Sequence, residues 1–240
     1  PLLIVRINAL DTGLSDDDLA AVIPAAPDAI LLPKAGSGAE IQDLSARIAV
    51  HEAEAGLEDG KIRIHALMTE TAGGMLSAAS FAAKSERLSA LAWGAEDLAA
   101  DIGASSNKDE NGVYTDVFRL ARSLAILAAA NSRVDAIDTV FTDFRDLDGL
   151  DTECRAAVRD GFSGKMAIHP DQVAVINRAF TPPSEDVERA VRIMALFAAA
   201  GPDAGVLSLD GKMIDKPHLR QAERVARMAG LSPDAIPSVS

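Results

Sequence analysis

Six charged or ionisable side chains stand at or just beyond the ends of short apolar runs, and they are the residues best placed to do chemistry. They are Arg6, Lys34, Glu70, Asp97, Asp143 and His169. Apolar runs of this length are typical of buried strands. The carboxyl ends of parallel strands meet at one edge of a sheet or barrel, where α/β proteins build their sites. We therefore expect these side chains to converge on a common site.

Glu70 and Asp97 are the pair that we select as metal ligands. Two carboxylates on neighbouring strand ends, with water completing the coordination shell, suit Mg²⁺, a hard ion that takes few protein ligands and keeps positions open for substrate oxygens. The alternative is that each carboxylate only caps or begins the helix after its strand. Both interpretations stay open at this point, because acidic residues are common at helix N-termini.

Arg6 and His169 also allow two interpretations each. Arg6 interrupts an apolar strand, so its guanidinium either faces a polar centre, where it could hold a carboxylate or a developing oxyanion, or lies exposed at an edge. His169 could act as a base, although a histidine at a strand end more often makes a structural hydrogen bond. The pattern alone decides neither residue.

The composition excludes several classes of partner. The 240 residues carry a formal net charge of −13, which argues against a nucleic-acid backbone or an anionic membrane as partner. The single cysteine, Cys154, excludes an internal disulfide bond and fits a reducing cytoplasm. No apolar run approaches the roughly 18 residues of a membrane span, and no signal peptide is visible. We expect a cytoplasmic protein.

The fold class follows from the alternation of strands and helices. We expect strands at residues 2–8, 29–33, 61–68, 88–93, 136–141 and 164–168, each with a helix after it. This is the pattern of a parallel α/β sheet. A (β/α)₈ TIM barrel needs two more units, and we expect them upstream of Pro1, because the chain begins within a strand and without methionine. A doubly wound open sheet is the alternative, although no GxGxxG motif follows any strand.

The motifs of the chain go beyond these patterns. The segment GFSGKMAIHPDQVAVINRAFTPPSEDVERA, residues 161–190, resembles the citrate lyase β-subunit family of the HpcH/HpaI aldolase superfamily, which includes malyl-CoA and citramalyl-CoA lyases. The same resemblance is carried, in the family's order, by VRIN at residues 5–8, MTETAGG at 68–74, LAWGAEDLAADIG ending at Gly103, and DGKMID at 210–215. Together these motifs span nearly the whole chain.

The resemblance implies a set of reactive side chains. By their motifs, Glu70 and Asp97 correspond to the family's Mg²⁺ ligands, and Arg6 corresponds to an arginine that contacts the substrate near the reacting carbons. Asp215 resembles an acid/base residue that a neighbouring subunit contributes. The family's first two strands, with an acidic E-D motif and an early arginine, have no counterpart in this sequence.

The resemblance also implies a cradle for a carboxylate. The backbone amides of the turn formed by Gly94, Ala95, Glu96 and Asp97 correspond to those that receive the carboxylate of a keto acid. The side chain of Glu96 is left without assigned chemistry, and we expect it to be structural.

The family fold is a (β/α)₈ barrel, usually assembled as a trimer or hexamer. We therefore expect residues 1–182 to form barrel units three to eight. Residues 183–240 should form C-terminal helices and an extension that completes a neighbouring active site.

The implied activity is Mg²⁺-dependent cleavage of a 3-hydroxyacyl-CoA, such as malyl-CoA or citramalyl-CoA. The products would be acetyl-CoA and a 2-keto acid: glyoxylate, pyruvate or oxaloacetate. One alternative is an aldolase that acts on free hydroxy-keto acids without CoA. Another is a citryl-ACP lyase subunit that acts only within a citrate lyase complex, or a paralogue that merely binds keto acids.

Overall fold

The computed structural model describes residues 2–82, 85–201 and 204–231. Within these residues, six strands form one parallel sheet in the order β1 to β6. Their bounds are Ile4–Arg6 for β1, Ala29–Leu32 for β2, Arg63–Leu67 for β3, Leu88–Ala92 for β4, Asp135–Asp138 for β5 and Gly164–Lys165 for β6. All six overlap the expected strands, so the alternation of strands and helices is confirmed.

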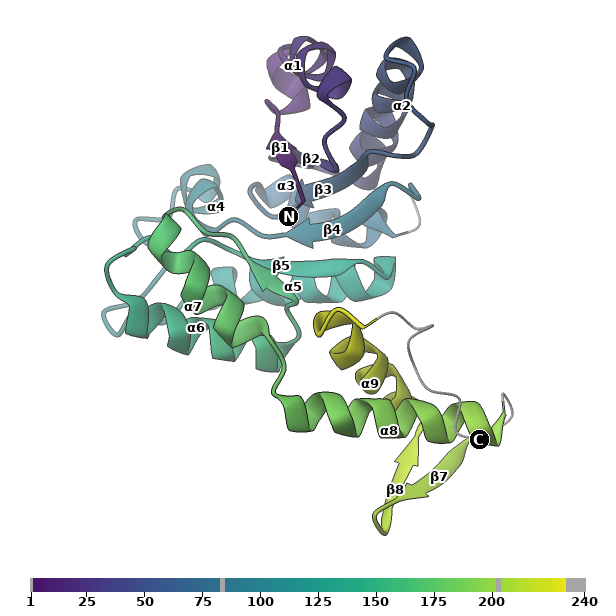
Figure 1. Ribbon diagram of the computed structural model, residues 1–240. Helices are drawn as coiled ribbons and strands as arrows, with labels where there is room; N and C mark the ends of the chain where they lie inside the picture. The colour runs from purple at the N-terminus through teal and green to yellow at the C-terminus, as the bar shows by residue number, and fades with distance from the viewer. Residues whose placement is uncertain (1, 83–84, 202–203, 232–240) are drawn as a thin grey trace. The chain divides into compact units, whose positions relative to one another are not determined.

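The sheet is curled, as in a half-barrel, and it is open (Figure 1). Its strand order follows the chain without the reversal that defines a doubly wound sheet, and this agrees with the barrel interpretation. Among the described residues, β1 and β6 are edge strands with a hydrogen-bonded neighbour on one side only. The described residues therefore form an open six-stranded arc, and the closed eight-stranded barrel is not seen in them.

Seven helices follow the strands of this sheet or its last loops in the described part of the chain. They are α1 (Ser15–Val22), α2 (Gly38–Glu54), α3 (Ala72–Leu76), α4 (Ala95–Ile102), α5 (Asp116–Ser132), α6 (Leu147–Asp160) and α7 (Pro170–Phe180). Helix α2 packs against β3, and α5 packs against β4 and β5. The buried face of α2 consists of Ile41, Leu44 and Ile48, which recur at helical spacing.

The chain divides into two compact units. The first comprises residues 1–146 and 156–170 and contains the sheet, whereas the second comprises residues 147–155 and 171–240. In the second unit, α8 (Ser184–Ala200) and α9 (Lys216–Met228) pack together. The end of the expected C-terminal extension, residues 232–240, lies outside the described residues.

The second unit contains a β-hairpin. Strand β7 (Val206–Leu209) pairs antiparallel with β8 (Lys212–Asp215), which the sequence analysis did not predict. Asp210 and Gly211 form the two-residue turn, and both have positive φ angles, 52° and 74°. Such an Asp-Gly pair is a strong hairpin signal. The buried side chains of Leu209 and Ile214 bind the hairpin to the core of this unit.

The last two strands of the sheet are shorter than expected. Strand β5 ends at Asp138 and β6 ends at Lys165, several residues before the predicted ends. The predicted strand ends were wrong because apolar residues such as Phe141 and Ile168 continue both apolar runs beyond the strands. The polar side chains at these two strand ends are therefore Asp138 and Lys165, instead of Asp143 and His169.

A buried ion pair holds the opposite, N-terminal ends of β3 and β4. Arg87, just before β4, makes a two-pronged contact with Glu52 on α2, with distances of 2.9 and 2.6 Å. The Glu52 carboxylate also accepts from the amides of Gly60 and Ile62. Burial opposes the ionisation of Glu52, but these hydrogen bonds outweigh it and hold its pKa below the usual range.

Replacement of Glu52 by Gln should destabilise the fold without touching the opposite edge of the sheet. The Glu52 side chain is fully buried and that of Arg87 is 7% exposed. The substitution leaves this guanidinium with only Asp59, which is largely exposed, as a carboxylate partner. We expect the free energy of unfolding to fall by about 3 kcal/mol. Denaturant unfolding followed by circular dichroism measures this change, and an unchanged midpoint would contradict it.

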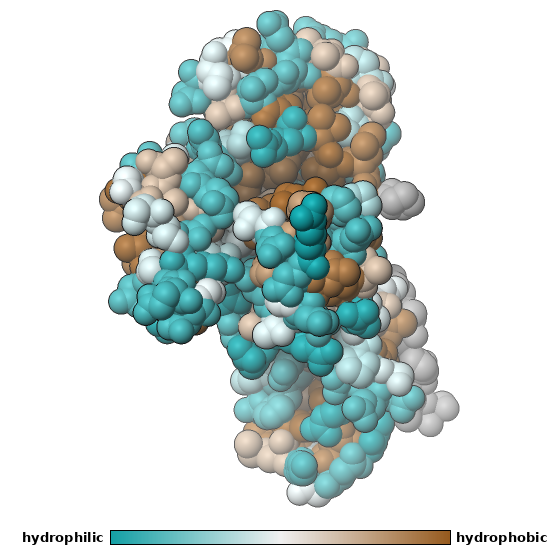
Figure 2. Space-filling model, turned by 90° about the vertical axis from the view of Figure 1, so that its left-hand side faces the viewer, coloured by the Kyte–Doolittle hydropathy of each residue, from teal (hydrophilic) through white to brown (hydrophobic). Residues whose placement is uncertain are grey.

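Apolar surface remains exposed along the first strand. Leu2 and Leu3, just before β1, and Ile4, its first residue, are 74%, 55% and 40% exposed. Apolar surface is also visible in the upper part of Figure 2. An exposed edge strand of this kind is suited to pair with further strands. None of the helices in the described part of the chain has the length and apolar character needed to cross a membrane.

Candidate active site

Four of the six candidate side chains line one cavity of about 440 Å³ in the first unit. Arg6 ends β1, Lys34 follows β2, Glu70 follows β3, and Asp97 lies in the first turn of α4, after β4. The cavity thus stands at the C-terminal ends of four neighbouring parallel strands. The rule that strand ends converge accounts for this arrangement.

Glu70 is held by the turn that follows β3. Thr71 caps the short helix α3, and its hydroxyl accepts from the amide of Gly74 at 3.1 Å. A Cβ atom at Gly74 would lie 2.1 Å from the carbonyl oxygen of Met68, so only glycine allows this close approach. The tight turn leaves the Glu70 side chain only 5% exposed.

The charge of Glu70 is poorly compensated. Burial raises its pKa from the ordinary value of 4.5 to about 7. The backbone amide of Lys34, which donates to the carboxylate at 2.6 Å, and the Arg6 guanidinium both oppose this rise, whereas the neighbouring Asp97 carboxyl reinforces it. Two adjacent carboxylates, one of them nearly buried, favour either a shared proton or a bound cation.

This pKa predicts a pH-dependent stability for the metal-free protein. A carboxyl group whose folded pKa is raised binds more protons in the folded state, so stability should fall as the pH rises from about 4.5 to about 7. Relative to a Glu70→Gln variant, the unsubstituted protein should lose up to about 3 kcal/mol across this window. Denaturant unfolding of both proteins in chelator, at a series of pH values, measures the difference. Parallel curves would contradict the prediction.

The turn between β4 and α4 packs directly on Glu70. A Cβ atom at Gly94 would lie 2.7 Å from the Glu70 Cγ atom, so this position has no room for a side chain. Gly94 is also the N-cap of α4, and it supplies no side-chain cap to the amides of Ala95, Glu96 and Asp97. Uncapped amides at a helix N-terminus attract a carboxylate. The carboxylate cradle expected at this turn stays a prediction.

Lys34 also lines the cavity, although the sequence pattern indicates no role for it. Its backbone is left-handed, with a φ angle of 52°, and such strain in a non-glycine residue gathers at functional sites. Its ammonium lies 3.5 Å from the Asp97 carboxylate, and both side chains are about half exposed. The contact is therefore weak, because solvent screens exposed ion pairs. The signal in the sequence was a lysine directly after an apolar run.

Three other acidic or basic candidates make contacts outside the cavity. The Glu96 carboxylate accepts from the Asn107 side chain at 2.7 Å, a structural contact with the loop after α4. The His169 ring stacks on Phe144, with 4.7 Å between ring centroids. The Asp143 carboxylate accepts from a backbone amide two residues ahead.

Asp215 lies in the second unit, at the N-terminus of α9. Its carboxylate contacts the Nδ1 atom of His218 at 2.6 Å, and the two residues form a reciprocal capping box. The hydrogen bond from His218 lowers the pKa of Asp215. An ionised carboxylate of this kind could accept a proton, and its expected contact with the Glu70 site of a neighbouring subunit stays a prediction.

The donor set fits a hard divalent cation. In the part of the chain that the structure describes, no three or more His, Cys, Asp or Glu side chains gather as a metal-binding group. Glu70 and Asp97 alone are too few for a structural zinc site, which closes its shell with four protein ligands. They suit Mg²⁺, which keeps several waters and is bound by one or two carboxylates together with substrate oxygens.

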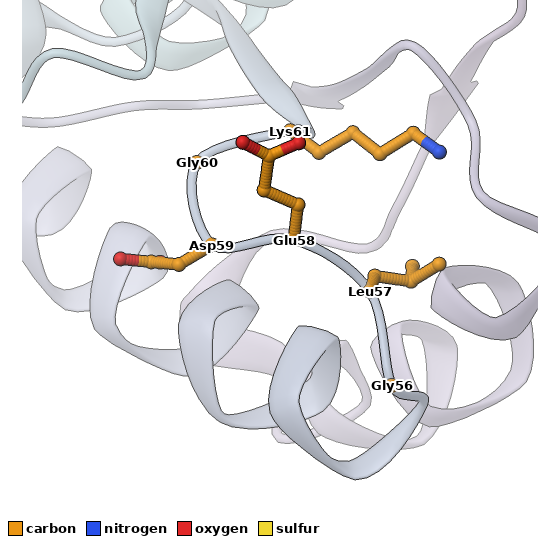
Figure 3. Close-up of a pocket in the computed structure, with 6 residues that line it drawn as sticks. All are labelled: Gly56, Leu57, Glu58, Asp59, Gly60 and Lys61. Atoms are coloured by element: carbon orange, nitrogen blue, oxygen red, sulfur yellow. The ribbon is translucent and has the colours of Figure 1, made fainter.

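A second cavity, of about 360 Å³, lies in the loop between α2 and β3 (Figure 3). Its lining is the segment 56–61, and the side chains of Asp59 and Lys61 point in different directions. Asp59 is moreover paired with Arg87 at 2.5 Å. This cavity is at the N-terminal ends of the strands and has no convergent set of polar groups.

Comparison with known proteins decides the family. Residues 2–170 match the model of the HpcH/HpaI aldolase/citrate lyase family. The chain belongs to this family. It is 36% identical to a citrate lyase subunit beta-like protein of Mycobacterium tuberculosis, over 95% of this chain and 76% of the relative. It is 35% identical to a mitochondrial citramalyl-CoA lyase of Rattus norvegicus, over 94% of this chain and 68% of the relative.

This family member is also similar, over most of its length, to a solved structure. The protein CitE of Mycobacterium tuberculosis, in complex with magnesium, acetoacetate and coenzyme A, is 35% identical and superposes with a TM-score of 0.69. The match covers 95% of this chain and 78% of CitE. Family membership confirms the resemblance found in the sequence and the expectation of a carbon–carbon lyase.

Proposed function

We propose that this family member is a Mg²⁺-dependent carbon–carbon lyase that cleaves a 3-hydroxyacyl-CoA, such as malyl-CoA or citramalyl-CoA, to acetyl-CoA and a 2-keto acid. The observation that carries the proposal is the buried, poorly compensated Glu70 beside Asp97 and Arg6 in one cavity. The relatives named as citramalyl-CoA lyase and CitE with magnesium, acetoacetate and coenzyme A support the substrate class.

In this proposal, each group at the site has one task. Glu70 and Asp97 hold Mg²⁺, which when bound supplies Lewis-acid polarisation of the substrate's hydroxyl and carboxylate oxygens. The amides at the start of α4 receive the carboxylate that remains on the keto acid. Arg6 stabilises the negative charge that develops on the thioester oxygen.

The proposed cleavage moves the proton of the 3-hydroxyl group and the electron pair of the C2–C3 bond. Loss of the 3-hydroxyl proton turns the C–O bond into a carbonyl, the C2–C3 bond breaks, and its electron pair becomes the thioester enolate. Protonation of the enolate carbon then gives acetyl-CoA. A carboxylate such as Asp215 of a neighbouring subunit would take the first proton and return one to the enolate.

The test is an assay of the purified chain with Mg²⁺ on malyl-CoA, citramalyl-CoA and free hydroxy-keto acids, each with a chelator control. We expect keto-acid release from a CoA ester, abolished by the chelator. Turnover of free acids alone would favour the aldolase alternative. Turnover only after addition of citrate lyase partner subunits and acyl carrier protein would favour the complex subunit.

The proposal also covers how the subunits assemble, how each barrel closes and where in the cell the protein acts. We propose a homotrimer or hexamer of closed barrels, the assembly implied by the family resemblance. In a closed barrel, a further strand would pair with edge strand β1 and cover the apolar residues at its start. Analytical ultracentrifugation measures the subunit number. The chain has a single cysteine, Cys154, which fits the cytoplasm, where we place the protein.

A further inference from the structure

A second cluster of buried charge stands two strands away from Glu70, and the proposed chemistry does not use it. At the end of β5, the Asp138 carboxylate accepts from the Trp93 indole N–H at 2.7 Å with one oxygen. Its other oxygen contacts the Lys165 ammonium, at the end of β6, at 2.8 Å. The side chains of Asp138 and Lys165 are 1% and 0% exposed, and Trp93 is fully buried.

This ion pair is costly to bury, so stability alone is a weak reason for it. Removing two charges from water carries a desolvation penalty that their mutual attraction often fails to recover, and apolar residues of similar volume commonly serve as well. Asp138 is nonetheless supplied with several polar contacts, since the Arg122 Nε atom also lies 3.8 Å from it. Such a fully paired network fixes one geometry for the groups that it contacts.

The group fixed here is the residue that leads into the site. Trp93 lies between the last residue of β4, Ala92, and Gly94, whose backbone packs against Glu70. A second contact also holds the indole, because Tyr114 meets it edge-to-face with ring centroids 5.1 Å apart. A shift of the Trp93 backbone would therefore be passed directly to the turn that contains Asp97.

We propose that Asp138 is a positioning residue: through its hydrogen bond to Trp93 it sets the geometry of the turn from Gly94 to Asp97. Lys165 holds the Asp138 carboxylate in place by its 2.8 Å contact, so that the carboxylate accepts the indole N–H in one orientation. The inference rests on the proposed function where it names Mg²⁺ and a keto acid as the ligands of this turn.

Three variants test the proposal. Asp138→Asn removes the charge opposite Lys165. Trp93→Phe removes the indole donor, together with part of the ring volume, while the Asp138–Lys165 pair stays intact. Glu52→Gln is the matched control, because it disrupts a buried ion pair at the other end of the same sheet. All are assayed well below their unfolding midpoints, which are measured by circular dichroism.

We expect both site variants to weaken pyruvate binding in the presence of Mg²⁺, measured by calorimetry, and to lower kcat/KM about ten-fold or more, since small misplacements of binding groups are expensive. Glu52→Gln should lower the unfolding midpoint and leave both quantities unchanged. If Trp93→Phe, although folded, binds and turns over like the control, the Trp93–Asp138 contact serves only the fold and the proposal is wrong.

The indole itself gives a readout that does not depend on catalysis. Trp93 is the only tryptophan of the chain, so its fluorescence anisotropy decay reports the mobility of this one position. Asp138→Asn should add fast indole motion that Glu52→Gln does not, and an indole equally rigid in both would overturn the inference. If the unsubstituted protein cleaves no CoA ester, the proposed function fails, and the anisotropy decay together with the pyruvate titration still decides the inference.

Discussion

Replacement of Glu70 by Gln should lower Mg²⁺-dependent turnover by about three orders of magnitude, the size expected when a preorganised charge opposite the transition state is lost. Glutamine has the shape of the protonated acid, so its carbonyl oxygen can still accept the Lys34 amide that now contacts Glu70 at 2.6 Å. The fold should therefore survive, whereas the anionic oxygens that a hard cation requires are gone.

The same substitution should make the metal-free protein more stable above neutral pH. Burial raises the pKa of Glu70 to about 7, so its ionised form is unfavourable in the folded state. The opposed changes, higher stability and lost turnover, separate a metal ligand from a structural carboxylate. In addition, Mg²⁺ should raise the unfolding midpoint of the unsubstituted protein by mass action and leave that of Glu70→Gln unchanged.

Glu52→Gln is the control for this experiment, because it removes a second buried glutamate of the same unit. It should lose stability and keep both turnover and the response to Mg²⁺. Unchanged turnover in Glu70→Gln, measured from keto-acid release, would refute the metal assignment. A Mg²⁺-induced stabilisation that persists in this variant would do so as well.

The sequence was a sound guide wherever hydrophobic pattern and strand order decide the outcome. Short apolar runs located all six strands, and the strand-end rule brought Arg6, Glu70 and Asp97 to one cavity. The predicted ends of β5 and β6 were wrong, because apolar residues continue past the last hydrogen bond between these strands. Where a strand stops depends on its neighbours in the sheet, and a single run of residues does not contain this information.

The details that tune the site depend on tertiary contacts. No local pattern indicates that Lys34 adopts a left-handed backbone and turns its amide toward Glu70. The pairing of Asp138 with Trp93 and Lys165 joins residues 45 and 27 positions apart in the chain. Gly94 was recognised as a break after an apolar run, but the reason for a glycine, its contact with Glu70, emerges only from the packing.

Asp215→Asn should lower turnover by about two to four orders of magnitude, the usual contribution of a positioned acid/base group. Asparagine is as good an N-cap as aspartate. Helix α9 should therefore begin at the same residue, and the second unit should keep its stability. The hydrogen bond from His218 lowers the pKa of Asp215, so its carboxylate is ionised and can take a proton. The amide of asparagine cannot take a proton in this way. Mg²⁺ binding, followed by calorimetry, should be unchanged.

The matched control is Asp210→Asn, in the turn of the same hairpin, where the carboxylate pairs with Arg192 at 2.6 Å on the surface. It should leave turnover as it is. Loss of Mg²⁺ binding in Asp215→Asn, or full turnover, would contradict a proton-transfer role for this residue.

Mixed assemblies decide whether Asp215 acts on a neighbouring subunit. Glu70→Gln and Asp215→Asn are each expected to be inactive alone. If every site combines Glu70 of one subunit with Asp215 of the next, random co-assembly of equal amounts restores both residues in about one site in four, because a head-to-tail interface repeats around the ring. If both residues act within one chain, no mixture recovers activity. The two variants are mixed, unfolded and refolded together, and the turnover of the mixture is compared with that of each variant refolded alone. Recovered turnover shows that Asp215 acts on a neighbouring subunit, and its absence shows that both residues act within one chain.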